Sequence, residues 1–200
     1  MPSDELAAVV AALVGGLPAV VPTDTLYGLA VSPFHAATPR ILYDIKGRPS
    51  EKPVAWLVAH GNDLDRFGAE VPAYARRLAT AFWPGALTVI VKASDAVPPA
   101  YRSRAGTIGL RMPDDALVRA IADKVGCPLA VTSANLSGQR DPKRFADLDP
   151  AVLSRVAAAI DDRQRKSGVG STVVDCTGDA PRILREGGIT RADIDAVLAG

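Results

Sequence analysis

The sequence predicts an α/β fold in which one twisted, mostly parallel or mixed sheet carries helices on both faces. Segments with helical spacing alternate with short, uninterrupted apolar runs such as 54–59 and 87–91. Strands that are apolar along their whole length are typical of sheets covered on both sides. A chain of 200 residues is the usual size of one domain and buries enough surface for a core without covalent crosslinks.

The first half of the chain gives helix and strand signals in a regular order. Apolar residues at helical spacing predict a helix over about 4–15, and an apolar run predicts a buried strand over 19–21. Thr38 is placed to cap a second helix, and Gly47 is placed to end it. The next elements expected are a strand over 54–59, a helix over 72–82 and a strand over 87–91.

The second half repeats this order. A strand over 107–112 leads to a helix over 114–125, which Gly126 ends, and then to a strand over 129–132. The remaining expected elements are a helix over 151–156, strands over 171–176 and 182–184, and a final helix that Thr190 begins.

The composition and the few cysteines and histidines argue against several kinds of function. Lys and Arg together number 23 against 22 Asp and Glu, so the net charge of +1 predicts no long-range attraction to nucleic acid. Cys127 and Cys176 lie in apolar runs outside any C-x-x-C or Cys/His cluster, and we interpret them as reduced core residues. His35 and His60 are flanked by loop-forming sequence and are interpreted as surface residues. A histidine-based triad or a metal site in the protein is therefore not expected.

The apolar run over residues 6–21 differs from a secretory signal peptide. Asp4 and Glu5 precede it where basic residues belong, and glycines and Pro18 interrupt it. No other segment approaches the length of a membrane span. We therefore expect a cytoplasmic protein with no membrane partner.

Basic residues are concentrated in the segment 46–53. Lys46, Arg48 and Lys52 lie there around two prolines that stiffen the loop. Their mutual repulsion would be relieved by a bound anion. Solvent together with Glu51 as a counterion would serve equally well, so the pattern alone leaves both interpretations open.

Two strand-associated segments carry further polar groups. Thr107, Gly109 and Arg111 share one face of a strand by the two-residue alternation, which places a cation and a hydroxyl where glycine leaves space. A salt bridge to a neighbouring carboxylate would also explain Arg111. The segment 132–135 ends a strand with hydrogen-bonding residues, as a ligand site or an ordinary Asx turn would. Phosphate-loop, dinucleotide-fingerprint and nucleophile-elbow motifs are absent from the sequence.

Six segments together resemble the YrdC-like family of threonylcarbamoyl-AMP synthases. They are PTDTLYGL (22–29), KGRPSEKP (46–53), FWPGALT (82–88), TIGLRMP (107–113), TSANLSG (132–138) and STVVD (171–175). The resemblance implies a single YrdC-like domain over residues 1–200 with a concave basic cleft. It also implies an enzyme that joins L-threonine, bicarbonate and ATP into threonylcarbamoyl-AMP and pyrophosphate. This adenylate serves the synthesis of N6-threonylcarbamoyladenosine in tRNA.

The resemblance also implies roles for individual residues. The implied threonine contacts are Thr25, Arg111 and Ser171. The implied ATP contacts are Arg48, Lys52, Thr107, Ser133 and Arg185. The implied catalytic residues are Lys46, Arg48, Ser133 and Asn135, of which Lys46 and Asn135 complete two signatures of the family.

This set contains no evident general base. Its absence suits a reaction in which a carbamate oxygen displaces pyrophosphate from the α-phosphorus, because positioning and charge neutralisation with Mg²⁺ supply most of the rate enhancement. The implied partner that consumes the product is a tRNA threonylcarbamoyl transferase complex, and direct tRNA binding by this chain is not required.

Two features depart from the family pattern. Leu57 stands where longer relatives carry a histidine near threonine. Residues 161–170 replace the glycine-rich approach to the STVVD segment, and they contain more basic residues than Asp161 and Asp162 neutralise. With glycines as hinges, this segment is either a lid that closes over bound nucleotide or an exposed connection.

Two other functions are compatible with the resemblance. A double-stranded RNA-binding module could use a concave basic surface of this fold, although near-neutral charge and few aromatic residues weaken this reading. A carbamoyl-transfer domain of hydrogenase maturation is the catalytic alternative, but the zinc-binding and acylphosphatase-like modules that accompany such a domain do not occur in this sequence.

Overall fold

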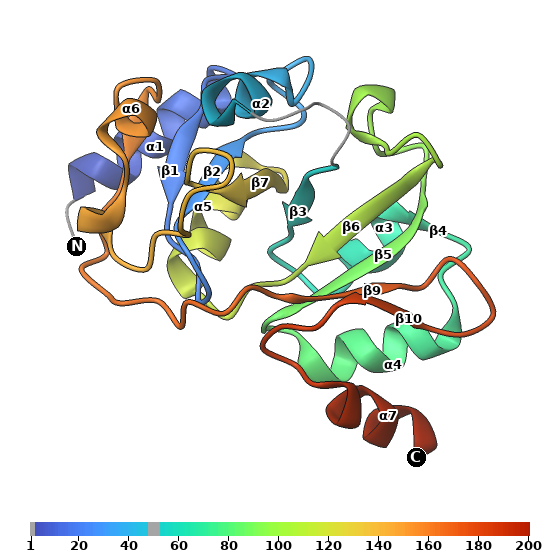
Figure 1. Cartoon of the computed structure of the whole chain (residues 1–200). Coiled ribbons are helices and arrows are strands. Elements are labelled where there is room, and N and C mark those ends of the chain that lie inside the picture. Colours follow the sequence, from blue (N-terminus) through green and yellow to red (C-terminus); the bar gives the residue numbers. More distant parts are fainter. Residues whose placement is uncertain (1–2, 48–52) are drawn as a thin grey trace.

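The computed structural model describes residues 3–47 and 53–200, which fold around one mixed sheet (Figure 1). Its strands are β1 (Ala19–Val21), β2 (Gly28–Val31), β3 (Ala55–Leu57), β4 (Gly68–Ala69), β5 (Leu87–Ala93), β6 (Thr107–Arg111), β7 (Leu129–Ser133), β8 (Ala158–Ala159), β9 (Thr172–Asp175) and β10 (Arg182–Arg185). Their order is β10-β9-β5-β6-β3-β7-β2-β1-β8, and β4 pairs with β5. The pairs β1–β8, β3–β6 and β5–β9 are parallel, whereas the remaining pairs of described strands are antiparallel. The expected mixed sheet is thus confirmed, with more antiparallel than parallel pairing.

Helices cover both faces of the sheet, as expected. They are α1 (Ser3–Val14), α2 (Arg40–Lys46), α3 (Asp63–Phe67), α4 (Ala73–Phe82), α5 (Ala116–Val125), α6 (Pro150–Leu153) and α7 (Arg191–Ala199). Helices α1 and α5 enclose one apolar core, and α2, α3, α4, α6 and α7 contribute to the other. Strand β1 separates the two cores, because Val20 packs into one while Ala19 and Val21 pack into the other.

Local signals account for the ends of the best-predicted helices. The Asp115 carboxylate accepts hydrogen bonds from the Leu117 and Val118 amides at 3.0 and 3.1 Å, so α5 begins after Asp115 rather than at 114. Gly126 ends α5 in the left-handed conformation with φ of 79°. Gly47 ends α2 in the same way with φ of 59°.

Strand β2 was not predicted from the sequence. The polar turn after β1 ends at Tyr27, and β2 begins at Gly28 and pairs with both β1 and β7. A Cβ atom at Gly28 would lie 2.5 Å from Val131 Cγ1, so glycine is what permits this close strand pairing. The short elements α3, β4 and β8 were also not predicted, and the helix expected over 151–156 already ends at Leu153.

The cysteine and histidine interpretations are confirmed. Cys127 and Cys176 are buried and form no disulfide. His35 is exposed, and the His60 side chain is 65% exposed beside Asp123. Within residues 3–47 and 53–200, no helix combines the length and apolar character needed to cross a membrane.

Candidate active site

A cavity of about 380 Å³ opens where the turn before β2 faces β3, β5, β6, β7 and β9. Six residues predicted from the sequence line it: Thr25, Thr107, Arg111, Ser133, Ser171 and Arg185. Lys46 and Asn135 lie behind Ser133 rather than in the lining. The predictions for Arg48 and Lys52 fall outside the described residues.

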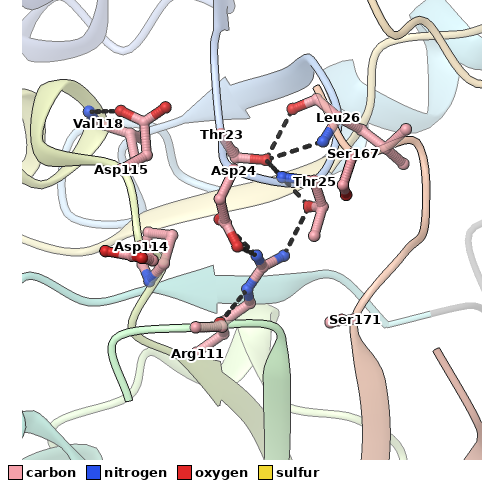
Figure 2. Close-up of polar contacts among 12 residues, drawn as sticks. Thr23, Asp24, Thr25, Leu26, Arg111, Asp114, Asp115, Val118, Ser167 and Ser171 are labelled. Atoms are coloured by element: carbon pink, nitrogen blue, oxygen red, sulfur yellow. Dashed lines mark hydrogen bonds and ion pairs between the residues drawn. The ribbon is translucent and has the colours of Figure 1, made fainter. Parts of the chain in front are cut away.

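Arg111 lies at the end of β6, and its side chain is only 7% exposed. Its Nη2 donates to both Asp24 carboxylate oxygens at 2.5 and 2.6 Å (Figure 2). Its Nη1 donates to Thr25 Oγ1 at 2.9 Å, and its Nε donates to the Gly85 carbonyl at 2.9 Å. Burial lowers the pKa of Arg111 and Asp24 opposes this shift, but a guanidinium stays charged in proteins. Arg111 therefore forms the salt bridge that the sequence left open and also lines the cavity.

Hydroxyl groups shape the turn that carries Thr25. Thr23 Oγ1 accepts from the Thr25 and Leu26 amides at 3.2 and 3.1 Å and donates to the Leu26 carbonyl at 2.7 Å. Because that bond uses the Thr23 proton, the 3.0 Å contact between the two threonine hydroxyls is donated by Thr25. Thr25 is therefore held between Thr23 and Arg111.

The Lys46 ammonium is buried and holds the loop after β7 together. Its Nζ donates to the Ser133 carbonyl at 2.5 Å and to the Asn135 carbonyl and Oδ1 at 2.7 Å each. Ser133 Oγ in turn donates to Asn135 Oδ1 at 2.6 Å. The structure thus joins three of the residues with predicted catalytic roles, and only Ser133 reaches the cavity. Lys46 therefore contacts Ser133 from outside the cavity lining, and its catalytic role stays a prediction.

Ser171 and Arg185 form the opposite side of the site. Ser171 Oγ lies 2.8 Å from Thr88 Oγ1, and Arg185 donates from Nε and Nη2 to the Ser171 carbonyl at 3.1 and 2.9 Å. A Cβ atom at Gly187 would lie 2.1 Å from the Gly170 carbonyl oxygen, so the two backbones touch beside Ser171. These contacts fix Ser171 at the cavity wall.

Sequence reasoning missed two residues of this site. Thr88 lies in an otherwise apolar stretch of β5, and a buried hydroxyl there was the available signal. Asp24 stands between two threonines of the turn, but nothing local indicated that it pairs with Arg111 across 87 positions of sequence. Leu57 also lines the cavity and presents an apolar side chain there.

Lys166, in the segment 161–170, has more acidic partners than the sequence indicated. Lys166 is only 3% exposed and forms ion pairs with Asp162 and with Asp115 at 3.5 Å. Asp115 caps α5 and supplies a carboxylate that the sequence interpretation did not count. A second cavity of about 860 Å³ is lined by Asp24, by residues 114–117 at the start of α5, and by residues 160–166. Whether the segment acts as a lid stays a prediction.

Comparison with known proteins places this geometry in a family. The Sua5/YciO/YrdC family model, described as "Telomere recombination", matches residues 11–187. The threonylcarbamoyl-AMP synthase of Bacillus subtilis (strain 168) is 37% identical over 178 residues, which are 88% of this chain and 51% of the relative. A relative from Mycobacterium tuberculosis (strain CDC 1551 / Oshkosh) is 35% identical over 189 residues, 94% of this chain and 87% of the relative.

A solved structure shares the same fold. The crystal structure of Pyrococcus abyssi Sua5 complexed with L-threonine superposes with a TM-score of 0.91 at 29% identity. The match covers 96% of this chain and 57% of that protein. The chain thus spans about half the length of the B. subtilis and P. abyssi proteins that it matches. By sequence match and by structure, the chain belongs to the Sua5/YciO/YrdC family.

Proposed function

We propose that this chain is an L-threonylcarbamoyladenylate synthase, a nucleotidyltransferase that uses L-threonine, bicarbonate and ATP. The observation that carries the proposal is the gathering of Thr25, Arg111 and Ser171 with Thr107, Ser133 and Arg185 around one cavity. These residues come from turns and strands far apart in the sequence. The name of the B. subtilis relative and the threonine-bound P. abyssi structure support the same assignment.

The reaction has two bond-forming steps. The threonine nitrogen attacks the bicarbonate carbon and forms a carbamate. In this step the ammonium loses two protons, one of which leaves in water with the displaced hydroxide while the other passes to solvent. A carbamate oxygen then attacks the α-phosphorus of ATP, and the bond to pyrophosphate breaks. Neither step transfers electrons to an oxidant, so the three substrates account for every atom of the products.

The threonine end of the site has the groups that this substrate needs. Arg111 is a buried cation that is suited to a carboxylate, and the nearby Thr25 hydroxyl is suited to hydrogen bonding. The Asp24 carboxylate already accepts hydrogen bonds from Arg111, so a substrate carboxylate must share Arg111 with Asp24 or displace Asp24 from it. Ser171, fixed by Thr88 and Arg185, offers a third polar contact at the wall.

The nucleotide is assigned to Thr107, Ser133 and Arg185, together with Arg48 and Lys52 outside the described residues. We propose that ATP enters as its Mg²⁺ complex, in which the ion neutralises phosphate charge. The described residues contain no group of three or more His, Cys, Asp or Glu side chains that could hold a metal. We therefore treat Mg²⁺ as part of the substrate. The protein's contribution is fixed hydrogen-bond donors and alignment of the carbamate with the α-phosphorus.

The chemistry of the product implies a partner. A carbamoyl adenylate is a mixed anhydride, which water hydrolyses and an amine attacks readily. A transferase that passes the threonylcarbamoyl group to adenosine in tRNA is the expected consumer of this product. Recognition of tRNA then belongs to that transferase complex, and the synthase needs no tRNA site.

Pyrophosphate release tests the proposal. The chain with Mg²⁺, ATP, L-threonine and bicarbonate should release pyrophosphate, and omission of any one of the three substrates should reduce release to background. Arg111→Met is the test variant, because it removes the proposed carboxylate contact and keeps most of the side-chain volume. ATP turnover that is equally fast without threonine, or that is unaffected in Arg111→Met, would overturn the assignment.

A further inference from the structure

Lys166 carries a deeply buried charge outside the lining of the proposed substrate cavity. Its side chain is 3% exposed, and its ammonium contacts Asp162, whose side chain is 8% exposed. Asp115 lies 3.5 Å away and is 11% exposed. The same ammonium lies 5.4 Å from the centre of the Tyr27 ring. A buried lysine is costly unless it is paired, so this site is built to hold a cation.

The partners of Lys166 tie three parts of the chain together. Asp162 belongs to the same segment, and it accepts a hydrogen bond from the Tyr27 hydroxyl at 2.6 Å. Asp115 caps α5 through the Leu117 and Val118 amides. Lys166 thereby joins the segment 161–166 to the start of α5 and to the end of the turn before β2.

The backbone beside Lys166 docks onto that same turn. The Ser167 amide donates to the Asp24 carbonyl at 3.3 Å, and the Gly168 amide donates to the Thr25 carbonyl at 2.9 Å. The Lys166 amide donates to the Lys143 carbonyl at 2.8 Å. Figure 2 shows Ser167 beside Thr25, with Arg111 on the other side of the turn.

These backbone contacts reach the residues that hold Arg111. The side chains of Asp24 and Thr25 accept from its two terminal nitrogens, while their carbonyls accept from the segment that Lys166 fastens. Lys166 itself borders the second cavity and is absent from the lining of the substrate cavity. Any effect it has on catalysis must therefore be indirect.

We propose that Lys166 is a positioning residue for the threonine end of the active site. Its ion pairs clamp residues 161–168 onto the turn at Asp24 and Thr25, and the clamped turn keeps Arg111 aimed at the substrate carboxylate. This inference rests on the proposed function for its kinetic consequence. Its structural consequence, the protection of the Ser167 and Gly168 amides, is independent of that function.

The test compares Lys166→Met with Arg165→Met, a matched control that removes the same charge from an exposed neighbour. Lys166→Met should raise the KM for L-threonine by at least about tenfold, because loss of alignment at a binding group has effects of this size or larger. The KM for ATP should change less than about twofold, since Thr107, Ser133 and Arg185, its assigned contacts among the described residues, lie outside the turn and outside residues 161–168. Arg165→Met should leave both values unchanged, and Lys166→Arg should restore most of the threonine affinity.

Hydrogen exchange gives the second readout. The amides of 166–168 should exchange faster in Lys166→Met than in the wild type and in Arg165→Met. If Lys166→Met fails to fold because Asp162 is left unpaired, the double variant Lys166→Met/Asp162→Asn removes both charges and takes its place.

Two results would overturn the inference: equal changes in both KM values, or unchanged exchange at 166–168. A wild-type chain that makes no threonylcarbamoyl-AMP would instead contradict the proposed function, and hydrogen exchange would still report on the clamp.

Discussion

Replacing Arg111 by methionine probes the centre of the site. The change removes hydrogen bonds to Asp24, Thr25 and the Gly85 carbonyl and leaves the Asp24 carboxylate, 19% exposed, without its cation. Removing one partner of a buried ion pair costs about 3 to 5 kcal/mol. Because both side chains of this pair are less than a fifth exposed, little of that cost is screened by solvent. Arg111→Met should therefore lower the free energy of unfolding by an amount in this range.

Urea denaturation at constant pH measures that free energy by linear extrapolation. A second variant, Arg111→Met/Asp24→Asn, separates two contributions to the loss of stability. One is the loss of the ion-pair attraction, and the other is the cost of leaving the Asp24 carboxylate buried without a cation. This double variant should recover more than about 1 kcal/mol, because a neutral amide is much less costly to bury than an unpaired carboxylate. Both variants should lose threonine-dependent activity. A loss below about 1 kcal/mol in the single variant, or no recovery in the double variant, would refute the reasoning that the pair is buried and coupled.

Three further predictions follow from individual contacts. Thr25→Val should raise the KM for L-threonine about tenfold, because the hydroxyl bonded to Arg111 is lost; initial rates against threonine concentration measure this, and an unchanged KM would contradict it. Burial raises the pKa of the Cys176 thiol to about 12, so at pH 8 the native protein should not react there with a thiol reagent, whereas the unfolded protein should; rapid native labelling at Cys176 would count against the buried position. Burial tends to raise the pKa of Asp175, but hydrogen bonds from Thr177 and Arg182 outweigh this and hold it below 3.8. A depressed pKa stabilises the fold above the unfolded value, and this stabilisation is lost as pH falls below about 4. In Asp175→Asn, the free energy of unfolding should therefore decrease less than in the wild type as pH falls below about 4. An unaltered dependence of urea unfolding on pH would argue against these contacts.

The sequence predicted the elements that carry local signals. Helix α5 has its cap at Asp115 and its terminating glycine at Gly126, and both act over a few residues. Strand β6 has the two-residue alternation that brings Thr107 and Arg111 to one wall of the cavity. Strand β2 escaped prediction because polar turn residues precede it and its boundaries depend on pairing with β7, which is distant in the sequence.

The sequence named six residues that line the cavity, but it did not indicate the contacts between residues of the site. Arg111 is recognisable as a strand-borne cation, but its partner Asp24 lies 87 positions away and shows no pattern that links the two. Lys46 illustrates the same limit. A basic loop suggested an anion site, whereas the fold turns the Lys46 ammonium inward onto Ser133 and Asn135. Long-range pairs of this kind are set by the sheet order, which short-range spacing does not encode.

The transfer of isotopically labelled bicarbonate tests the central claim most directly. Incubation of the chain with labelled bicarbonate, L-threonine, ATP and Mg²⁺ should give an adenylate that contains both the threonine and the carbon label, together with an equal amount of pyrophosphate. Mass spectrometry resolves this product from AMP and from a simple threonyl adenylate. An adenylate without the label, or no adenylate when all substrates are present, would contradict the assignment.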